Sequence, residues 1–405
     1  MGRNVIITGG ELFNKGAQSM TFAVVQELRR RFPDHSVFLL SGMDYERDEQ
    51  EKAQYTFGIL PMSAGLIIEL TGGLGKSLVW LRKGLGGKRY YDRECIATLD
   101  EILRKSDLMV DISGYGLSSQ RGLYSSISYL LKMRLAKKYN IKCIVMPQSF
   151  GPFNYVGPLE PIMDYLIRKY MSYPEVIYAR EREGYEMLTQ RYGLDNVKKS
   201  YDLVLLSDEI ELSSVYKSPP HFPAVDHIDG VGIVPNAKNF IHGNATDILC
   251  VYDRTIEELC SDGNQVYIIR HSEEDADICR KMKKRYAENG NVVLVDRDMS
   301  CMEYDQLVRQ LRFVIASRYH SIIHAYRNGI PCIAIGWASK YKELLELFGQ
   351  DRYLFDVREG IDIDVYIETL TIMQNQYNEE STKIANKLGW IQSEKLFDIV
   401  GKIKK

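Results

Sequence analysis

The chain has 405 residues, of which 45% are hydrophobic and 26% are charged, and its formal net charge at pH 7 is −2. This length predicts two or three globular domains, and the composition excludes an intrinsically disordered chain. Because a chain without a basic surplus does not gather nucleic acid by counterion release, nucleic acid is not an expected partner.

Neither export nor a membrane span is expected. The opening run MGRNVIITGG is too short in apolar residues for a signal peptide, and the longest charge-free run, 55–68, is shorter than the ~20 residues of a membrane-spanning helix. The seven cysteines show no C-x-x-C spacing, which favours reduced thiols. We therefore expect a cytoplasmic protein.

Apolar runs alternate with helical patterns through the first half of the chain. Strands are expected at 4–10, 36–42, 108–114, 141–149 and 175–181, with helical spacing between them, as in 16–32 and 125–139. This alternation is typical of βαβ units around a parallel sheet. It predicts a Rossmann-like domain over residues 1–215.

A second series of strands follows a break in the pattern. Three prolines interrupt residues 212–228, and strands are then expected at 230–236, 265–272, 291–298, 313–317 and 332–337. We place a second Rossmann-like domain at 229–363, and final helices at 364–405 that pack back on the first domain. The predicted fold class is α/β, with two doubly wound domains facing a cleft and their strand carboxyl ends directed into it.

The richest stretch is FVIASRYHSIIHAYRNGIPCIAIGW, residues 313–337. Ser317, Arg318, Tyr319 and His320 fall where a buried strand meets a helix, beside free N–H groups and the positive end of the helix dipole. Arginine adds a fork for carboxylate or phosphate, and histidine can transfer a proton. The plainer alternative is that Arg318 pairs with an acid and His320 caps the helix.

A metal site is not expected. His320 and His324 have the i, i+4 spacing of a helical metal pair, but neither a third ligand nor the glutamate of H-E-x-x-H accompanies them. The run GGLGKS, 72–77, imitates a phosphate loop but has Leu70 where the first glycine is required.

Polar residues also follow other predicted strands. They lie in GGELFNKGAQS (9–19), DISGYGLSSQRG (111–122), MPQSFGPF (146–153) and at the end of 230–236. Ordinary turns are the alternative interpretation of these segments. The residues expected to line the cleft are Asn14, Gly16, Ser113, Gly114, Gln148, Ser149 and Asn236. Arg180, which ends the 175–181 strand region, is a second candidate anion ligand.

One segment has the composition of a membrane-surface contact. Residues 78–91 interleave Trp80, Tyr90 and Tyr91 with lysine and arginine, after an apolar stretch. We expect peripheral contact with the inner face of the membrane through residues 55–91. The alternative is an insertion packed on its own domain.

In their order along the chain, FNKGAQS, PQSFGPF, YARERE, SRYHSIIHAYRNGIPCIAIGW and the following Lys340 resemble the polysaccharide pyruvyl transferases. The resemblance implies a GT-B-like fold, phosphoenolpyruvate as co-substrate without a further cofactor, and a sugar or lipid-linked glycan as acceptor, to which pyruvate is attached as a ketal. It also implies a donor side in the second domain and an acceptor side in the first.

The resemblance assigns roles residue by residue. The arginine and histidine of the family's R-L-H motif correspond to Arg318 and His320, with Tyr319 in place of leucine, and the arginine of its A-R-E motif corresponds to Arg180. Many relatives have an acidic residue after N-x-G, whereas Ala17 and Gln18 follow here. The donor-binding residues expected on these grounds are Arg180, Ser317, Arg318, Tyr319, His320 and Lys340, with His320 and Arg318 catalytic.

Two other functions fit the same architecture. The first is a metal-independent glycosyltransferase that uses a nucleotide sugar. The second is a catalytically silent protein that binds a glycan or a partner, and its sugar binding would survive Arg318→Ala and His320→Ala.

Overall fold

The computed structural model of the chain describes residues 3–72, 91–220, 222 and 228–402. The chain divides into two compact units. Unit 1 contains Met1–Phe13, Met20–Pro220 and Lys395–Lys405, and unit 2 contains Asn14–Ser19 and His221–Glu394. A short N-terminal segment, Asn14–Ser19, is therefore packed with the second half of the chain.

Unit 1 is built on a parallel sheet that has seven strands within the described residues, in the order β3-β2-β1-β4-β5-β6-β7. All seven of these strands pair in parallel, and the strand order reverses direction between β1 and β4, as in a doubly wound fold. The strands are β1 (Arg3–Thr8), β2 (His35–Leu40), β3 (Gly58–Leu60), β4 (Ser106–Asp111), β5 (Lys142–Gln148), β6 (Val176–Ala179) and β7 (Val197–Lys199).

Helices connect these strands, and polar side chains cap several of them. Ser63 accepts a hydrogen bond from the backbone of Leu66 at the start of α3, and Asp92 accepts one from Cys95 at the start of α5. The helices of unit 1 are α1 (Lys15–Arg31), α2 (Glu49–Ala53), α3 (Ala64–Thr71), α5 (Arg93–Arg104), α6 (Gly122–Lys138), α7 (Leu159–Met171), α8 (Arg182–Glu186), α9 (Leu203–Leu206), α10 (Leu212–Val215) and α18 (Asp398–Lys402). The first turn of α1 is the part that belongs to unit 2.

Unit 2 repeats the same topology. Its described residues form a six-stranded parallel sheet in the order β10-β9-β8-β11-β12-β13, and the strand order reverses between β8 and β11. The strands are β8 (Val231–Val234), β9 (Val266–Ile269), β10 (Val292–Val295), β11 (Phe313–Ala316), β12 (Cys332–Gly336) and β13 (Leu354–Asp356). The predicted α/β class, with two doubly wound sheets, is confirmed.

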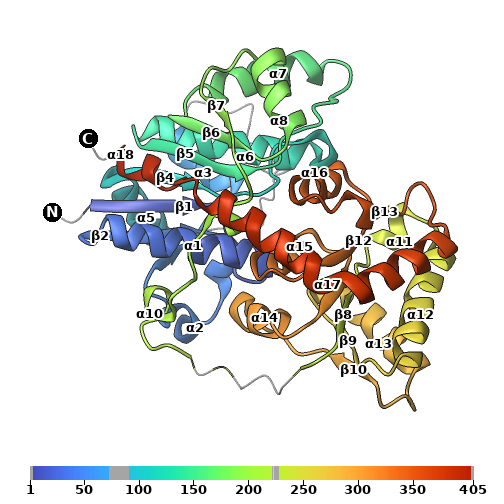
Figure 1. Cartoon of the computed structure of the whole chain (residues 1–405). Helices are drawn as coiled ribbons and strands as arrows, with labels where there is room; N and C mark the ends of the chain where they lie inside the picture. The colour runs from blue at the N-terminus through green and yellow to red at the C-terminus, as the bar shows by residue number, and fades with distance from the viewer. Residues whose placement is uncertain (1–2, 73–90, 221, 223–227, 403–405) are drawn as a thin grey trace. The chain divides into compact units, whose positions relative to one another are not determined.

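The last long helix packs on unit 2. The helices of this unit are α11 (Asn239–His242), α12 (Ala245–Ser261), α13 (Ala276–Arg285), α14 (Cys301–Val308), α15 (Tyr319–Arg327), α16 (Ser339–Phe348) and α17 (Ile363–Gln392). α17 contacts α12, α15 and α16 (Figure 1). Of the predicted C-terminal helical region, residues up to Glu394 belong to unit 2 and Lys395–Lys405 belong to unit 1.

Three strands have no counterpart in the sequence analysis. β3, β7 and β13 each have three residues and form the outer edges of their sheets. A three-residue strand is too short to display a period of two, so its sequence gives no usable signal. These strands widen both sheets at their edges, outside the strands that the sequence predicts.

The membrane-related predictions fall partly outside the described residues. Residues 73–90, which contain most of the phosphate-loop-like run and most of the aromatic and basic segment, are not described. Among the residues that are described, the structure contains no helix with the length and apolarity needed to cross a bilayer.

Candidate functional site

A buried carboxylate organises the strand ends of unit 1 where the sheet reverses direction. Asp111, the last residue of β4, accepts hydrogen bonds from Thr8 Oγ1 (2.8 Å), Ser113 Oγ (2.9 Å) and Gln148 Nε2 (3.1 Å). The ammonium of Lys132 lies 3.4 Å from Asp111 Oδ2 and donates to Ser113 Oγ at 2.7 Å. The structure thus brings the predicted residues Ser113 and Gln148 together, and Lys132 compensates the buried charge.

Arg180 lies in a second polar cluster of unit 1. Its guanidinium donates to Glu181 (2.8 Å), Asp202 (2.5 Å) and Ser149 Oγ (2.6 Å), and its side chain is only 5% exposed. The backbone N–H of Ser149 donates to the carbonyl of Gly114, which links the two predicted loops. Two carboxylates therefore surround the arginine that the sequence marks as an anion ligand.

Sequence reasoning missed one carboxyl in the glycine-rich loop after β1. Burial raises the pKa of Glu11, and the nearby charge of Asp44 raises it further, while Lys132 and Arg121 oppose the shift. Raised carboxyl pKa values at strand ends are a common feature of proton-transfer sites. The only available signal was the position of Glu11 inside a segment already singled out for its glycines.

In unit 2, Ser317 and Asn236 meet at the reversal point between β8 and β11. Asn236 Nδ2 donates to the carbonyl of Ser317 at 2.9 Å, and the hydroxyl of Tyr341 donates to the same oxygen at 3.1 Å. The hydroxyl groups of Ser317 and Tyr252 lie 2.8 Å apart. Both predicted residues are buried, so they fix the backbone where β11 ends.

Arg318 follows directly and forms the N-cap position of α15. Its Nε and Nη2 donate to the two oxygens of Asp275, at 2.9 and 2.5 Å, and its Nη1 lies 2.6 Å from Glu274 Oε1. The side chain of Asp275 is fully buried, whereas that of Glu274 is 45% exposed. One fixed and one exposed carboxylate therefore hold the guanidinium.

The predicted residues Asn14, Gly16 and His320 also meet in unit 2. Asn14 Oδ1 accepts from the backbone N–H groups of Gly16 (3.0 Å) and Ala17 (3.3 Å), so Asn14 caps the first turn of α1. The imidazole of His320 lies against Gly16 so closely that a Cβ at position 16 would be 2.2 Å from the ring. Only glycine leaves room for the ring in this position.

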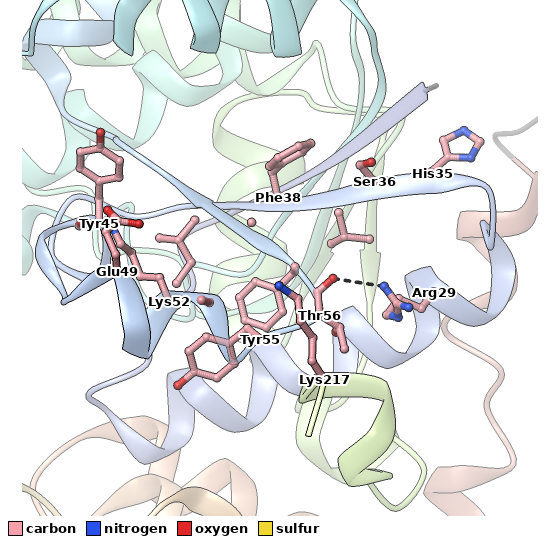
Figure 2. Close-up of a pocket in the computed structure, with 15 residues that line it drawn as sticks. Arg29, His35, Ser36, Phe38, Tyr45, Glu49, Lys52, Tyr55, Thr56 and Lys217 are labelled. Carbon is pink, nitrogen blue, oxygen red and sulfur yellow. Dashed lines mark hydrogen bonds and ion pairs between the residues drawn. The ribbon is translucent and has the colours of Figure 1, made fainter. Parts of the chain in front are cut away.

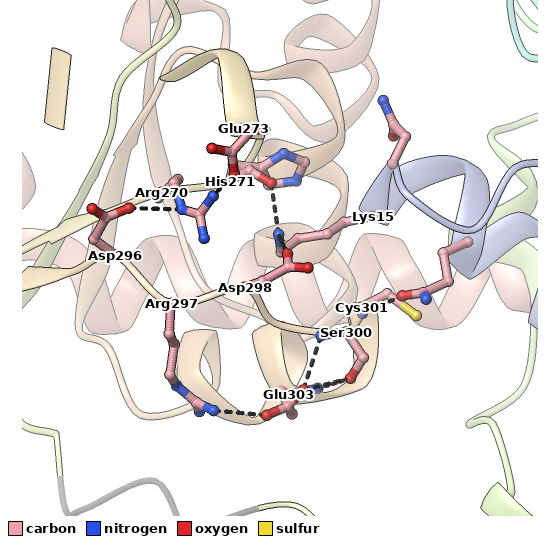
Figure 3. A network of polar contacts seen from close by, with 12 residues as sticks. Lys15, Arg270, His271, Glu273, Asp296, Arg297, Asp298, Ser300, Cys301 and Glu303 are labelled. Carbon is pink, nitrogen blue, oxygen red and sulfur yellow. Dashed lines mark hydrogen bonds and ion pairs between the residues drawn. The ribbon is translucent and has the colours of Figure 1, made fainter. Parts of the chain in front are cut away.

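A lysine from the same turn enters the polar network of unit 2. Lys15 is 5% exposed, and its ammonium donates to the carbonyl of His271 at 2.8 Å and lies 4.0 Å from Asp298 (Figure 3). Burial lowers the pKa of Lys15, and nearby Arg270 adds to this effect, whereas Asp298 opposes it. Although the lysine stands inside FNKGAQS, sequence reasoning gave it no role.

His271, two residues after β9, is a third residue that was missed. It is buried, and its Nε2 makes no hydrogen bond among the described residues. Burial lowers its pKa well below the ordinary value, and the charges of Lys15, His324, Arg318 and His320 act in the same direction. Cationic and titratable groups from three separate segments, Lys15, His271 and residues 318–324, thus converge at the carboxyl edge of this sheet.

His324 lies close to these residues, but its imidazole is held by other side chains of the protein. Its Nδ1 is 2.7 Å from Asp305 Oδ1, and its Nε2 is 3.1 Å from Ser19 Oγ. Both ring nitrogens therefore have protein partners. Within residues 3–72, 91–220, 222 and 228–402, no cluster of three or more histidine, cysteine or acidic side chains could hold a metal ion.

The remaining donor-side prediction, Lys340, lies near the start of α16. Its ammonium is 4.9 Å from the ring centroid of Tyr319 and 5.9 Å from that of Tyr341. The cation therefore stands over the ring that opens α15. Ser317, Arg318, Tyr319, His320 and Lys340 all lie in unit 2, whereas Arg180 lies in unit 1.

Several solved structures are similar to this chain along nearly its whole length. UDP-GlcNAc 2-epimerase from Methanocaldococcus jannaschii is 13% identical, with 93% of each chain covered and a TM-score of 0.56. The spinosyn forosaminyltransferase SpnP is 13% identical, with 100% of this chain and 99% of that chain covered and a TM-score of 0.57. An E. coli trehalose-6-phosphate structure bound with UDP-2-fluoro glucose is 9% identical, with 99% of both covered and a TM-score of 0.56. These likenesses establish a GT-B-like fold.

Comparison at the sequence level gives the family. No curated protein matches the chain. A family model described as polysaccharide pyruvyl transferase matches residues 14–339, from the cap of α1 to the start of α16. The match spans every site residue that the sequence predicts except Lys340, which directly follows it, and it begins after Glu11. The chain therefore belongs to the polysaccharide pyruvyl transferase family.

Proposed function

We propose that the protein transfers pyruvate from phosphoenolpyruvate to a pair of sugar hydroxyls, as a ketal, during the synthesis of a cell-surface glycan. The observation that carries this proposal is the convergence of Lys15, His271, Arg318 and His320 in unit 2. Phosphoenolpyruvate presents a carboxylate and a phosphate, so its site needs at least two cationic or helix-terminal anchors.

The donor anchors are those at the β11–α15 junction and beside it. Arg318 offers Nη1 once a ligand displaces the exposed carboxylate of Glu274, while Asp275 keeps the guanidinium in place. The first N–H groups of α15 and the ammonium of Lys340 supply further positive charge. We assign Ser317 and Tyr319 to shaping this junction, and Lys15 to the same anion site.

The proposed chemistry needs proton transfer but no metal and no further cofactor. His320 protonates the methylene carbon of phosphoenolpyruvate, one sugar hydroxyl adds to the neighbouring carbon, phosphate leaves, and the second hydroxyl closes the ketal. The two hydroxyls release two protons, of which one replaces the proton given to the methyl group and one is taken up by phosphate. Fixed cations beside the departing phosphate stabilise the developing charge.

Unit 1 supplies the acceptor side in this proposal. Ser113 and Gln148, held by Asp111, and Ser149 and Gly114 in the adjoining loop offer polar groups to sugar hydroxyls. Glu11, with its raised pKa, is the carboxyl that we assign to receiving a hydroxyl proton. We place the reaction in the cytoplasm, with peripheral membrane contact through 55–91 for a lipid-linked acceptor.

A nucleotide sugar is the competing donor, because the similar structures include glycosyltransferases and UDP-sugar complexes. The experiment compares thermal stabilisation by phosphoenolpyruvate with that by UDP- and GDP-sugars, and measures phosphate release with glycan acceptors. A ligand at 100 times its dissociation constant stabilises the native state by ~2.7 kcal/mol.

The matched variants are Arg318→Ala and Arg285→Ala. Arg285 is in the same unit, is 54% exposed and pairs with Asp253, so its loss controls for removing a cation. Stabilisation by phosphoenolpyruvate that disappears only in Arg318→Ala supports pyruvyl transfer. Stabilisation by a nucleotide sugar alone replaces this proposal with glycosyl transfer, and sugar binding without any donor response indicates a silent glycan-binding protein.

A further inference from the structure

A pocket of about 600 Å³ lies in unit 1 beside the amino-terminal half of β2 (Figure 2). Residues of β2, β3 and α2 line it, together with Arg29 near the end of α1 and Lys217 after α10. The candidate residues of unit 1 follow the carboxyl ends of the strands, whereas His35 and Ser36 in this pocket open β2. Its volume suits a ligand of one or two sugar rings.

Aromatic side chains form much of the wall. The ring of Phe38 lies over Gly58 of the neighbouring strand, where a Cβ would be 2.6 Å from the ring. Tyr55 stacks on Phe57 with their ring centroids 5.0 Å apart, which stiffens the wall behind. Tyr45 is held in place by Lys52, which donates to its carbonyl and lies 4.6 Å from its ring centroid. Rigid aromatic faces of this kind suit the apolar face of a sugar ring.

The polar lining carries a positive surplus. Arg29, Lys52 and Lys217 face the pocket with a single carboxylate, Glu49, so its formal charge is +2 with histidine neutral. Glu49 pairs with Lys52 at 2.6 Å, which leaves the other two cations without a carboxylate partner among the described residues. Arg29 uses one N–H on the carbonyl of Thr56, at 3.2 Å. The rest of its fork and the Lys217 ammonium remain available to an anion.

A buried nitrogen adds a third polar feature. His35 lines the pocket, and its side chain is 10% exposed. Its Nε2 lies 3.3 Å from Asp107, whereas its Nδ1 is buried without a hydrogen-bond partner among the described residues. Buried polar atoms in folded proteins nearly always find a partner, so this nitrogen is an unsatisfied polar atom within a residue of the pocket wall.

From these features we propose that the pocket is a second saccharide site, separate from the candidate active site, which binds an anionic sugar of the glycan. In this site, Phe38 and Tyr45 contact the face of the sugar ring, and Arg29 and Lys217 bind its carboxylate or phosphate. The inference rests on the proposed function only in taking the ligand to be part of the acceptor glycan. Binding at this site keeps the glycan on the protein while a different sugar of the same glycan reacts in the candidate active site.

The test measures binding of four probes by saturation-transfer NMR and calorimetry: glucuronic acid, glucose 6-phosphate, glucose and inorganic phosphate. For the wild type we expect both anionic sugars to bind more tightly than glucose or phosphate alone. Arg29→Ala combined with Lys217→Ala should weaken the anionic sugars about tenfold. Lys198→Ala, which removes an exposed lysine of unit 1 outside the pocket, should change nothing.

Phe38→Leu separates sugar recognition from anion attraction. It should weaken glucuronic acid and glucose 6-phosphate several-fold and leave phosphate binding unchanged, because it removes the ring and keeps an apolar side chain. The relative strength of the two anionic sugars tells a carboxylated glycan from a phosphorylated one.

Repeating the titrations in Arg318→Ala keeps this inference distinct from the proposed function. Binding of the anionic sugars should persist there, whatever donor the enzyme uses. The proposal is overturned if glucose binds as tightly as the anionic sugars, if inorganic phosphate alone matches them, or if the double variant binds like the wild type.

Discussion

Gly16→Ala should disable the enzyme through His320, although it removes no functional group. A Cβ at position 16 would lie 2.2 Å from Cγ and 2.3 Å from Nδ1 of His320. Ordinary carbon contacts are about 3.5 Å or longer, so the ring must move by roughly 1.3 Å. A displacement of about 1 Å at a reacting group can cost about 100-fold in rate, which is the loss we expect in kcat.

The effect on stability is expected to be much smaller. Overpacking a filled site costs roughly 1–3 kcal/mol. Alanine is favoured over glycine inside a helix by about 1 kcal/mol, and Gly16 is the second residue of α1, so part of the cost is offset. The net destabilisation of roughly 0–2 kcal/mol leaves the protein folded at assay temperature, and a thermal melt would detect a shift of only a few degrees.

The assay is phosphate release from phosphoenolpyruvate with a glycan acceptor, measured for Gly16→Ala, His320→Ala and the double variant. Because Gly16→Ala acts through the histidine, it should reduce turnover almost no further when His320 is already replaced by alanine. Gly389→Ala is the matched control, because a Cβ at that position in α17 meets no atom within 4 Å. Near-normal turnover in Gly16→Ala, or losses that multiply in the double variant, would refute the reasoning.

Four further predictions concern charged residues of the two units and the requirement for a metal. Glu274→Gln should tighten phosphoenolpyruvate binding up to about fivefold, because it removes the exposed carboxylate that competes for Arg318; calorimetry that shows weaker binding would contradict this. The pKa of His271 is lowered in the folded protein, so below pH ~6.5 the unfolded chain binds a proton that the folded protein does not, and the free energy of unfolding decreases as the pH falls. In urea melts at several pH values, this free energy should change with pH less steeply in His271→Gln than in the wild type, by up to ~1.4 kcal/mol per pH unit. Asp111→Asn should cost ~3–5 kcal/mol in the same melts, against at most ~1 kcal/mol for Asp100→Asn, whose carboxylate is 33% exposed and pairs with the exposed Arg104. Turnover should persist in a chelator, and loss of turnover that added metal restores would show a metal requirement.

The central strands were predictable because their signal is local. Buried parallel strands such as β1 and β11 are short unbroken apolar runs, and helical periodicity separates them from the next run. The topology then follows from right-handed crossovers between neighbouring strands. The edge strands have no such pattern, since pairing with β2, β6 or β12 determines whether three residues become a strand.

The partners of the candidate residues could not be predicted, because they are distant in sequence. Arg318 pairs with Asp275, 43 residues earlier, and Lys15 reaches the carbonyl of His271 across 256 residues. Sequence reasoning placed polar residues at strand ends, where parallel sheets bind ligands, and this rule needs no contact information. The same rule gives no weight to Lys15, whose position is fixed by the packing of the first turn of α1 with unit 2.

Two arginines were predicted as anion ligands from the same kind of pattern, and the structure places them in different electrostatic surroundings. Arg180 is 5% exposed, and both of its carboxylate partners, Glu181 and Asp202, are nearly buried. Displacing either would leave a buried charge unpaired, which costs several kcal/mol. Arg318 keeps one buried partner, but its other partner, Glu274, is 45% exposed and returns to water at little cost. An anionic donor can therefore recruit Arg318 by a local exchange of carboxylates, whereas Arg180 is better suited to hold the loop that carries Ser149.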